Sequence, residues 1–404
     1  MLQPERDCDV VVIGAGIVGA CTAFMLAKRG AKVLLVDAES PGRGCSYGNS
    51  GALSVGSIAP LAMPGILRSL PRVVFARDSP LRIDPLYLPR ALPWLARFVA
   101  SAKPDQVERV ARELHGLHAG AIDAHAALAQ EVGAPELILR RGHLHLYPDR
   151  EAWGKDRAVW DLRARFGIRF ETLDRDGIVA LEPRIGARYN VGVFLPDHAT
   201  VINPYRYVER VVAAFEALGG CIARDRVHLT RTGHAVRCVG AREYVASQVV
   251  VAAGVDAKPL LRAVGVRVPL ISQRGYHVMF TDGEAPITRT VALADRKVFL
   301  APMEEGLRIG GTVEIASPQA PPDPRRFAQL SHFARETFGR LGGRQTHWMG
   351  NRPCTPDSVP IIGPADGIAN LWLALGHGHL GLTQSVPTAQ RLGEAIMRRA
   401  SIAR

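Results

Sequence analysis

The chain has 404 residues, 47% of them hydrophobic, and a formal net charge of +12. This length is enough for one large domain or two medium domains with a sizeable buried core. The positive charge comes from single arginines among apolar residues. No Lys/Arg block with interleaved aromatic residues occurs, so the composition does not favour nucleic-acid binding.

Six cysteines lie far apart, and none forms a CxxC pair or a zinc-type spacing with histidines. This pattern predicts no metal site and indicates a reduced compartment. Acidic residues precede the first apolar run and glycines interrupt it, which disfavours a secretory signal. No stretch approaches about 20 uninterrupted apolar residues, so no transmembrane helix is expected. We therefore expect a cytoplasmic protein.

The first expected element is a strand over residues 9–14, a β-branched run typical of a strand buried on both faces of a parallel sheet. Residues 20–30 have helical periodicity and end at Gly30, a residue suited to a helix C-terminus. A second buried strand is expected over residues 31–37. The order strand, helix, strand is typical of the start of a doubly wound α/β fold.

A GxGxxG motif, formed by Gly14, Gly16 and Gly19, stands between the first strand and the helix. Gly14 permits the tight turn, Gly16 lets the backbone approach a pyrophosphate, and Gly19 allows the helix to pack closely on the strand. The free amides at the helix N-terminus favour phosphate. Asp37 ends the second strand, where a carboxylate accepts hydrogen bonds from ribose hydroxyls. The motif predicts FAD or NAD, and the acid at position 37 disfavours NADP.

A long loop of small residues follows Asp37, where a simple nicotinamide enzyme would continue with regular βα units. Long loops inside a domain are usually functional. Here the chain resembles the FAD-dependent D-amino-acid oxidase and dehydrogenase superfamily, and most closely its bacterial D-amino-acid dehydrogenase branch, including D-proline and 4-hydroxy-D-proline dehydrogenases. In that branch a Ser-x-x-Asn-x-Gly loop wraps the flavin, and Ser46, Asn49 and Gly51 match this loop.

The resemblance recurs in order along the chain, at residues 248–255 (QVVVAAGV), 307–314 (LRIGGTVE), 350–363 (GNRPCTPDSVPIIG) and 376–383 (GHGHLGLT). It implies FAD, and we expect the FAD to be bound non-covalently because no cysteine or histidine matches a covalent flavin attachment. The residues that motif and resemblance together predict to contact FAD are Gly14, Gly16, Ile17, Val18, Gly19, Asp37, Ala38, Ser46, Asn49, Ser50, Gly51, Ala52, Leu53, Val227, Ala253, Gly254, Gly350, Arg352, Gly378, His379, Leu380, Gly381, Leu382 and Thr383.

The resemblance also implies the fold class, an α/β protein in which a Rossmann-like FAD-binding domain is interleaved with an α+β substrate domain built on an antiparallel sheet. We expect the FAD-binding domain to use residues 1–65, 202–265 and 346–404, and the substrate-binding domain to use 66–201 and 266–345. Strands of the substrate domain are expected within residues 142–147, 191–203, 274–280 and 298–303.

Oxidation of an amino acid by a flavin needs an anchor for the carboxylate and a wall that orients the α-hydrogen, rather than a dedicated catalytic triad. The resemblance gives the anchoring role to Arg352. A guanidinium suits this role because it binds a carboxylate with two parallel hydrogen bonds. The alternative is an arginine that only pairs with nearby Asp357.

Tyr276 is a second catalytic candidate, which either hydrogen-bonds the substrate carboxylate or is a core aromatic with its hydroxyl already satisfied. His277 is a weaker candidate, because neighbouring strand residues point to opposite faces. His379 stands where the glycine oxidase branch has an arginine. It either replaces that arginine, orients the amine or only packs. The helix that begins near Thr383 is expected to point its N-terminus at the flavin C2 carbonyl.

The function expected from these residues and the resemblance is oxidative deamination of D-amino acids, cyclic D-imino acids included, by hydride transfer to flavin N5. The alternatives are a glycine- or sarcosine-type amine oxidase, a 2-hydroxy-acid oxidase, and a flavin-bearing subunit of a larger oxidoreductase complex. The electron acceptor is left open between oxygen and a quinone. Residues 63–102 mix apolar residues with spaced arginines, which suits either contact with the inner face of the cytoplasmic membrane or an ordinary helical subdomain.

Overall fold

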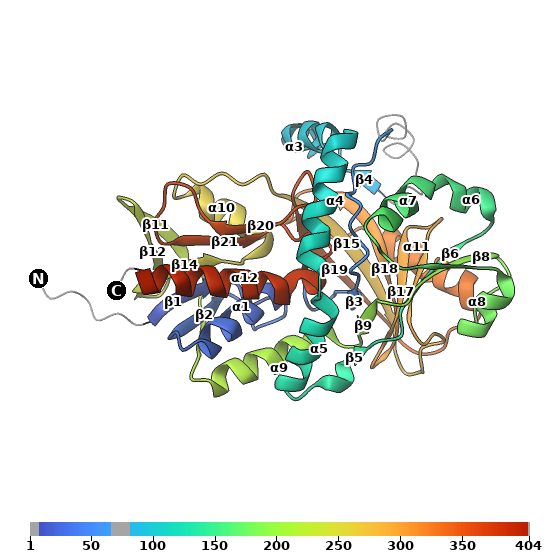
Figure 1. The fold of residues 1–404 in the computed structure, drawn as a ribbon, viewed down its shortest axis with the longest axis horizontal. Coiled ribbons are helices and arrows are strands. Elements are labelled where there is room, and N and C mark those ends of the chain that lie inside the picture. The colour runs from blue at the N-terminus through green and yellow to red at the C-terminus, as the bar shows by residue number, and fades with distance from the viewer. Residues whose placement is uncertain (1–7, 66–80, 403–404) are drawn as a thin grey trace, which may run out of the picture.

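The computed structural model describes residues 8–65 and 81–402. Figure 1 shows two lobes side by side, one built on a parallel sheet and the other on a larger mixed sheet. The described chain passes between the lobes several times, as expected for interleaved domains. The described chain begins at β1 and ends with α12, and both elements belong to the parallel-sheet lobe.

The parallel-sheet lobe has six strands in the order β10-β2-β1-β14-β21-β20. All neighbours are parallel except β20 and β21. The strands are β1 (Cys8–Ile13), β2 (Val33–Asp37), β10 (Cys221–Arg224), β14 (Ala246–Val251), β20 (Ile361–Pro364) and β21 (Leu371–Leu375). Alternate residues of β1 pack into different cores, Val10 and Val12 on one face and Val11 and Ile13 on the other. This explains the continuous apolar run at 9–14.

Helices cover one face of this sheet, and a small sheet with a short helix covers the other. The first face carries α1 (Ile17–Lys28), α9 (Pro204–Ala217) and α12 (Gly381–Ile402), with α5 (Ala121–Glu131) beside α12. The second face carries β11 (His228–Thr232), β12 (Ala235–Val239), β13 (Glu243–Tyr244), the 3-10 turn η2 (Gly254–Asp256) and α10 (Ala257–Arg262).

The second lobe is a nine-stranded sheet in the order β19-β15-β18-β17-β16-β6-β8-β7, with β4 also paired to β18. The strands are β4 (Leu81–Ile83), β6 (His143–Tyr147), β7 (Glu171–Leu173), β8 (Val191–Leu195), β15 (Ile271–Phe280), β16 (Thr290–Leu293), β17 (Val298–Met303), β18 (Gly306–Ile315) and β19 (Gln345–Cys354). Most pairs are antiparallel, as expected, but β16–β6 and β18–β4 are parallel.

The two faces of this sheet differ, and we name them the outer and inner faces. On the outer face, Tyr276, Val278 and Phe280 of β15 pack against α11 (Pro324–Phe338), with α8 (Arg175–Leu181) further along. The inner face carries Gly275, His277 and Met279, the alternate residues of β15, and is turned toward the loop that follows β2. The candidate site therefore lies between this inner face and the parallel sheet.

Small elements connect the lobes. A three-stranded sheet joins β3 (Ala52–Leu53), β9 (Ala199–Val201) and β5 (Ile138–Leu139), next to the 3-10 turn η1 (Pro135–Leu137). The helices α3 (Leu88–Ala100) and α4 (Pro104–His118) stand along the junction of the lobes in Figure 1, and α6 (Arg150–Lys155) and α7 (Arg157–Arg165) flank the larger sheet.

One expected domain boundary differs from the structure. We expected the chain to return to the FAD-binding domain at residue 346, but β19 pairs with β15 from Gln345 to Cys354. This segment belongs to the nine-stranded sheet because every residue of β15 from Ile271 to Phe280 has a partner on β19. Residues 66–80 of the arginine-rich stretch at 63–102 lie outside the described residues.

Candidate active site

The carboxyl ends of the parallel strands gather the dinucleotide-motif residues at one edge of the sheet. Gly14 follows β1 with φ +105°, and a Cβ there would lie 2.6 Å from the carbonyl oxygen of Ala252. A Cβ on Gly19 would lie 1.8 Å from the carbonyl oxygen of Gly14. These contacts explain both glycines, since any side chain would separate α1 from the turn.

Gly16 and Asp37 complete the cradle. Gly16 is the N-cap of α1 and offers no side chain to the free amides of the first turn. Asp37 ends β2, and its carboxylate accepts hydrogen bonds from the amides of Ala15 at 2.6 Å and Glu39 at 2.9 Å. The carboxylate thus stands beside the helix N-terminus, where a ribose next to a bound pyrophosphate would lie.

The loop after β2 closes over this cradle. Ser46 Oγ accepts a hydrogen bond from the amide of Ile17 at 2.9 Å, and Asn49 Oδ1 accepts one from the amide of Gly51 at 2.8 Å. Gly51 has φ +74°, and a Cβ there would meet the carbonyl oxygen of Val201 at 2.2 Å. The backbone therefore requires glycine at the last position of the Ser-x-x-Asn-x-Gly loop.

The start of α12 is joined to the same loop. Thr383 Oγ1 accepts a hydrogen bond from the amide of Ser54 at 3.0 Å and donates one to the carbonyl oxygen of Ala52 at 3.3 Å. The other predicted FAD contacts lie on these segments or at neighbouring strand ends. They are Val18 on α1, Ala38 after β2, Ser50 and Leu53 in the loop, Val227 after β10, Ala253 and Gly254 after β14, Gly350 on β19, and Gly378, Leu380, Gly381 and Leu382 at the entry to α12.

Arg352 lies on the inner face with its guanidinium flat against the backbone of Gly275, where a Cβ would lie 2.2 Å from its Cζ. It donates one hydrogen bond to the carbonyl oxygen of Thr312 at 3.2 Å, and it makes no ion pair with the described residues. Asp357 pairs with Arg109 instead, at 3.3 Å. Burial lowers the pKa of the Arg352 guanidinium. A cation that is partly removed from water and has no anionic partner is costly, so this position favours a ligand carboxylate.

The His379 side chain has solvent-accessible surface, but much of its surroundings is protein rather than water. It is exposed, yet the surrounding protein lowers the pKa of its imidazole to about 4 by desolvation, with further lowering from the Arg352 charge and then His118. His379 is therefore a neutral imidazole near the Arg352 guanidinium.

Tyr276 does not lie at this site, which corrects its assignment as a catalytic candidate. Its hydroxyl donates to Glu314 at 2.5 Å and accepts a hydrogen bond from the amide of Asp323 at 3.2 Å. Its ring packs on the outer face, edge-on to Phe327 of α11. Glu314 also pairs with Arg274 at 3.0 Å. Tyr276 is thus the satisfied core aromatic of the alternative interpretation.

His277 occupies the inner face in place of Tyr276. Its Nδ1–H donates to the carbonyl oxygen of Gly48 at 3.1 Å, and its ring stacks on Trp348 of β19. Burial lowers the pKa of His277 to about 3, so the ring is uncharged. A Cβ on either Gly48 or Gly350 would lie 2.0 Å from the Trp348 ring. The two glycines therefore make room for this indole beside the loop.

Arg308 is a further inner-face residue that the sequence interpretation missed. Its guanidinium donates to the carbonyl oxygen of Asn49, while its buried Nε has no hydrogen-bond partner among the described residues. Burial lowers the pKa of Arg308 to about 10. The alternation of LRIGGTVE was a usable signal, since the polar residue stands between two buried apolar ones.

Three neutral histidines hold the segment that follows β3. The Nδ1–H of His118 donates to the carbonyl oxygen of Val55 at 3.1 Å, and His198 Nε2 accepts a hydrogen bond from the amide of Gly56 at 3.0 Å. The Nδ1–H of His198 then donates to His143 Nδ1 at 3.1 Å. Burial lowers the pKa of His118 and of His143 to about 4. The bonds accepted by His198 Nε2 and His143 Nδ1 require neutral rings, because a protonated imidazole accepts no hydrogen bond.

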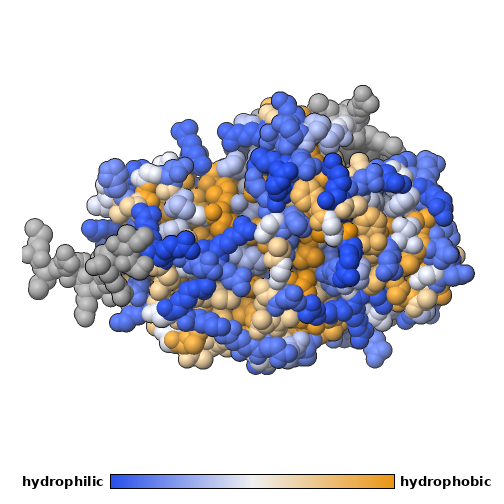
Figure 2. All heavy atoms as spheres, in the orientation of Figure 1, coloured by the Kyte–Doolittle hydropathy of each residue, from blue (hydrophilic) through white to orange (hydrophobic). Residues whose placement is uncertain are grey.

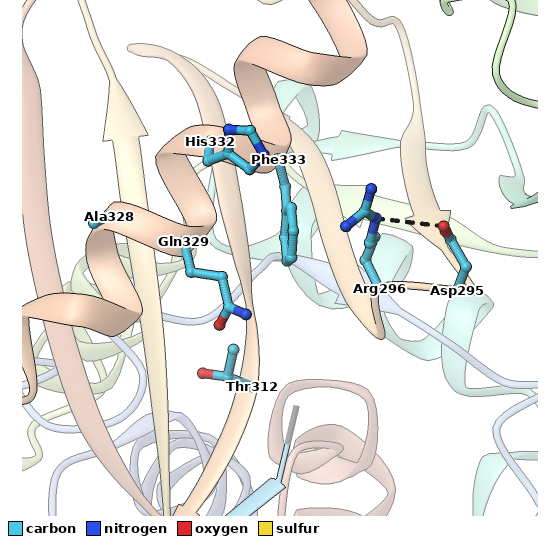
Figure 3. A pocket seen from close by; sticks show the side chains of 7 residues that line it. All are labelled: Asp295, Arg296, Thr312, Ala328, Gln329, His332 and Phe333. Atoms are coloured by element: carbon cyan, nitrogen blue, oxygen red, sulfur yellow. Dashed lines mark ion pairs between the residues drawn. The ribbon is translucent and has the colours of Figure 1, made fainter. Parts of the chain in front are cut away.

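A separate hollow of about 500 Å³ lies against α11 on the outer face. Figure 3 shows Gln329 of α11 pointing toward Thr312, with Arg296 paired to Asp295 across the opening. This hollow is on the side of the sheet opposite Arg352 and the glycine motif, so it is not part of the candidate site. Among the described residues, no group of three or more His, Cys, Asp or Glu side chains is arranged to hold a metal ion.

The edge of the parallel sheet fits a flavin dinucleotide on structural grounds. Glycines at 14 and 16 let the backbone at the N-terminus of α1 approach a pyrophosphate, and Asp37 suits a ribose. Arg308 Nε and Gln384 Oε1 are buried polar atoms without partners among the described residues, beside the loop and at the start of α12. His379 and Arg352 lie close enough to interact electrostatically. These features define an FAD-binding α/β oxidoreductase fold.

The chain belongs to the DAO family of FAD-dependent oxidoreductases, whose family model matches residues 9–395. It is 35% identical to a D-amino-acid oxidase of Bradyrhizobium diazoefficiens, over 96% of this chain and 94% of that protein. It is 34% identical to D-amino acid dehydrogenase 2 of Ralstonia nicotianae, over 97% of each chain.

Solved structures agree on the fold. Glycine oxidase from Geobacillus kaustophilus matches with a TM-score of 0.76 and 20% identity, covering 98% of this chain and 95% of that one. L-proline dehydrogenase from P. horikoshii matches with a TM-score of 0.73 and 17% identity, with the same coverage. The predicted fold class is thereby confirmed, and the family match confirms FAD as the cofactor.

Proposed function

We propose that this enzyme oxidises D-amino acids, with Arg352 as the anchor of the substrate carboxylate. The observation that supports the proposal most directly is the partly buried Arg352 guanidinium on the inner face, without an ion pair among the described residues and beside the FAD-binding edge. An amino-acid substrate supplies the carboxylate this guanidinium lacks. Full-length relatives named D-amino-acid oxidase and D-amino acid dehydrogenase support the D-configuration.

FAD, when bound, supplies the oxidant that accepts a hydride from the substrate α-carbon. The chain's own residues supply orientation. Arg352 holds the carboxylate. The guanidinium packs against the backbone of Gly275, and this contact limits its movement away from the substrate. The substrate amine loses a proton to solvent as the hydride leaves. The product is an imino acid, which water converts to a 2-oxo acid and ammonia.

His379 is suited to hold the substrate amine. Because the pKa of its imidazole is lowered to about 4, the ring is neutral at physiological pH and has one nitrogen free to accept an N–H. A neutral ring also avoids placing a second cation next to the amine. His379 therefore orients the amine rather than replacing an arginine in a two-cation clamp.

The test is anaerobic mixing of the FAD-loaded enzyme with paired D- and L-amino acids, following flavin absorbance. We expect D-amino acids to bleach the flavin and their L-enantiomers to leave it oxidised. Glycine, sarcosine and a 2-hydroxy acid, tried in parallel, test the alternative substrates. Bleaching only by a hydroxy acid, or by no compound at all, would reject the proposal.

D-proline and 4-hydroxy-D-proline belong in the same experiment. A structural neighbour with 17% identity carries the name L-proline dehydrogenase, which shows that this fold accommodates a cyclic amine in that protein. Bleaching by D-proline at a rate matching the best acyclic D-amino acid would extend the proposal to cyclic imino acids. If no substrate bleaches the flavin until a second protein is added, the chain is instead a subunit of a larger complex.

The electron acceptor is a separate proposal, since the two relatives divide between an oxidase and a dehydrogenase. We favour a quinone at a membrane surface, because α3 and its surroundings expose Leu61, Leu86, Leu88 and Leu92, and Leu86 is 89% exposed. No described helix is long and apolar enough to cross a membrane, so the contact would be peripheral.

Sedimentation with vesicles of anionic lipid tests the membrane contact. We expect the wild-type enzyme to sediment with the vesicles and a double variant, Leu86→Ser with Leu92→Ser, to stay in solution. Stoichiometric hydrogen peroxide during turnover in air would instead identify oxygen as the acceptor.

A further inference from the structure

The inner face carries a row of ring side chains with one gap. His277 of β15 pairs laterally with Trp348 of β19 and with Gly310 of β18, and Gly310 pairs in turn with Phe299 of β17. Residues that pair laterally point to the same face of a sheet. The row on the inner face is therefore Trp348, His277, Gly310 and Phe299, in that order.

The first two rings of the row already stack. The Trp348 and His277 centroids are 5.2 Å apart, and their planes differ by 20°. This separation follows from the strand spacing of about 4.8 Å, since each side chain rises from its own strand. One strand further the row reaches Gly310, which has no ring, and one strand beyond that it reaches Phe299. A ring placed over Gly310 would lie about 5 Å from His277 and from Phe299, within the range for aromatic pairs.

A methyl group fits over Gly310, which is itself a buried residue. Apart from chain neighbours, an ideal Cβ on Gly310 would meet only His277 Cβ at 3.4 Å and the carbonyl oxygen of Tyr276 at 3.5 Å. The next residue differs, because a Cβ on Gly311 would lie 2.7 Å from a Val298 methyl. Gly311 is therefore filled by packing, whereas Gly310 forms the floor of a gap.

The gap lies next to the carboxylate anchor. The Arg352 guanidinium rests on Gly275, two residues before His277 on β15. Two residues along a strand correspond to about 7 Å. This is the scale of an amino acid whose carboxylate is bound at one end and whose side-chain ring lies at the other. The walls are uncharged, since burial holds the pKa of His277 at about 3.

We propose that the gap over Gly310 receives a ring of the substrate side chain, so that D-amino acids with aromatic side chains are preferred substrates. The inference rests on the proposed function and adds a specificity-determining position to it. His277 and Phe299 form the two walls, and Gly310 is the floor that a larger residue would fill. Phe299 is partly buried, whereas His277 and Gly310 are buried, so the gap is an internal one.

The variant Gly310→Ala tests the gap on the FAD-loaded enzyme. Alanine is tolerated there because Gly310 is not among the glycines with positive φ and its new contacts are ordinary ones. The measured quantity is kcat/KM for D-phenylalanine divided by kcat/KM for D-alanine. We expect the variant to lower this ratio at least tenfold, equivalent to about 1.4 kcal/mol. Gly116→Ala, which adds the same methyl to open space on α4, is the matched control and should leave the ratio as it is.

Phe299→Leu removes one wall while keeping the apolar character. We expect it to lower the same ratio by roughly threefold to tenfold, the value of one lost aromatic pair. Binding without chemistry gives a second readout. Titrating the wild-type holoenzyme with 3-phenylpropionate and with propionate, which lack the amine and cannot be oxidised, compares the affinity for the ring alone. 3-Phenylpropionate should bind the more tightly, and Gly310→Ala should abolish the difference.

Three results would overturn the inference. One is an unchanged substrate ratio in Gly310→Ala. Another is loss of FAD from that variant, which would assign the gap to the flavin itself. The third is equal affinity of the wild-type enzyme for the two acids. Failure of the proposed function looks different, because then no D-amino acid reduces the wild-type flavin. Reduction by D-alanine without any preference for D-phenylalanine rejects the gap alone.

Discussion

The edge of the parallel sheet and the inner face of the nine-stranded sheet form the two sides of the candidate site, and they are built differently. The edge is made of backbone, with glycines at 14, 16 and 19 that let a ligand and a helix approach. The inner face is made of side chains, with Arg352, Arg308 and His277 brought together from three strands. A backbone cradle is encoded within a few consecutive residues, whereas a side-chain face depends on how distant strands align.

The largest expected effect is a loss of kcat/KM caused by a substitution on the inner face. Replacing Arg352 with Ala removes the only proposed partner of the substrate carboxylate. The loss of a partner from a buried charge pair costs about 2–5 kcal/mol, or roughly 30- to 4,000-fold in kcat/KM. FAD content should be retained. Steady-state kinetics with a D-amino acid and the flavin absorbance of the purified variant measure both.

Arg109→Ala is the matched control for Arg352, because Arg109 is the partner that Asp357 actually has. It is 44% exposed at the side chain, so its kcat/KM should stay within about twofold of the wild-type value. Equal losses in the two variants would contradict the anchoring role of Arg352.

The second effect is a loss of stability in acid. The pKa of His143 is about 4 in the folded protein, below the usual value of 6.5, so folding favours the neutral ring. Above pH 6.5 this contribution is complete, and as the pH falls toward 4 the unfolded chain binds the proton first. The loss is about 3 kcal/mol for this histidine alone. Urea unfolding at pH 7.5, 6 and 5 measures it.

His143→Gln tests the origin of that slope. The amide keeps a polar group at the site but does not titrate, so the decline between pH 7.5 and 5 should be shallower than in the wild-type protein. An identical slope in both proteins would mean that His143 is not responsible. His228, which is exposed on β11, is the control position for the same substitution.

The third expected effect is a loss of FAD binding at the edge of the parallel sheet. Gly14→Ala places a Cβ 2.6 Å from the carbonyl oxygen of Ala252 and requires φ +105° of a residue that disfavours it. Strain of this kind costs about 1–3 kcal/mol. We expect the variant to fold but to purify with less FAD, measured as the ratio of flavin to protein absorbance. Normal FAD content would show that the turn is not the cradle.

The smallest expected effect on activity comes from a substitution on the outer face of β15, at Tyr276. Tyr276→Phe removes a hydroxyl that bonds to Glu314 on the outer face, so stability should fall by about 1–3 kcal/mol. The kcat/KM of the holoenzyme should change less than about threefold, because the hydroxyl does not reach the site. A large rise in KM with unchanged stability would restore Tyr276 as a substrate contact.

The sequence predicted the edge of the parallel sheet well because its signals are local. The strand at 9–14, the glycine turn and the helix after it are consecutive, and the buried strands and turn have the expected order. The inner face was predicted less well. Motif resemblance pointed to Arg352, but the choice between Tyr276 and His277 depended on which face of β15 is covered by α11. That contact joins residues about 50 positions apart and leaves no local pattern.

Phe299 and Trp348 were missed for the same reason. Each lies in a strand with ordinary alternation, and only the lateral register of β17, β18, β15 and β19 brings them into one row. The same long-range pairing explains why the boundary at residue 346 was misplaced. β19 stays in the nine-stranded sheet to Cys354, and only then does the chain cross to the parallel sheet.

The contact between Arg352 and Gly275 has a consequence for protein engineering. Because the guanidinium occupies the volume that any side chain at position 275 would need, the two positions should vary together in related sequences. A redesign that replaces the anchor with a smaller residue would leave a void above Gly275, which a larger residue there could fill. Transplanting this anchor into another scaffold would likewise require moving both residues, one to bind and one to leave room.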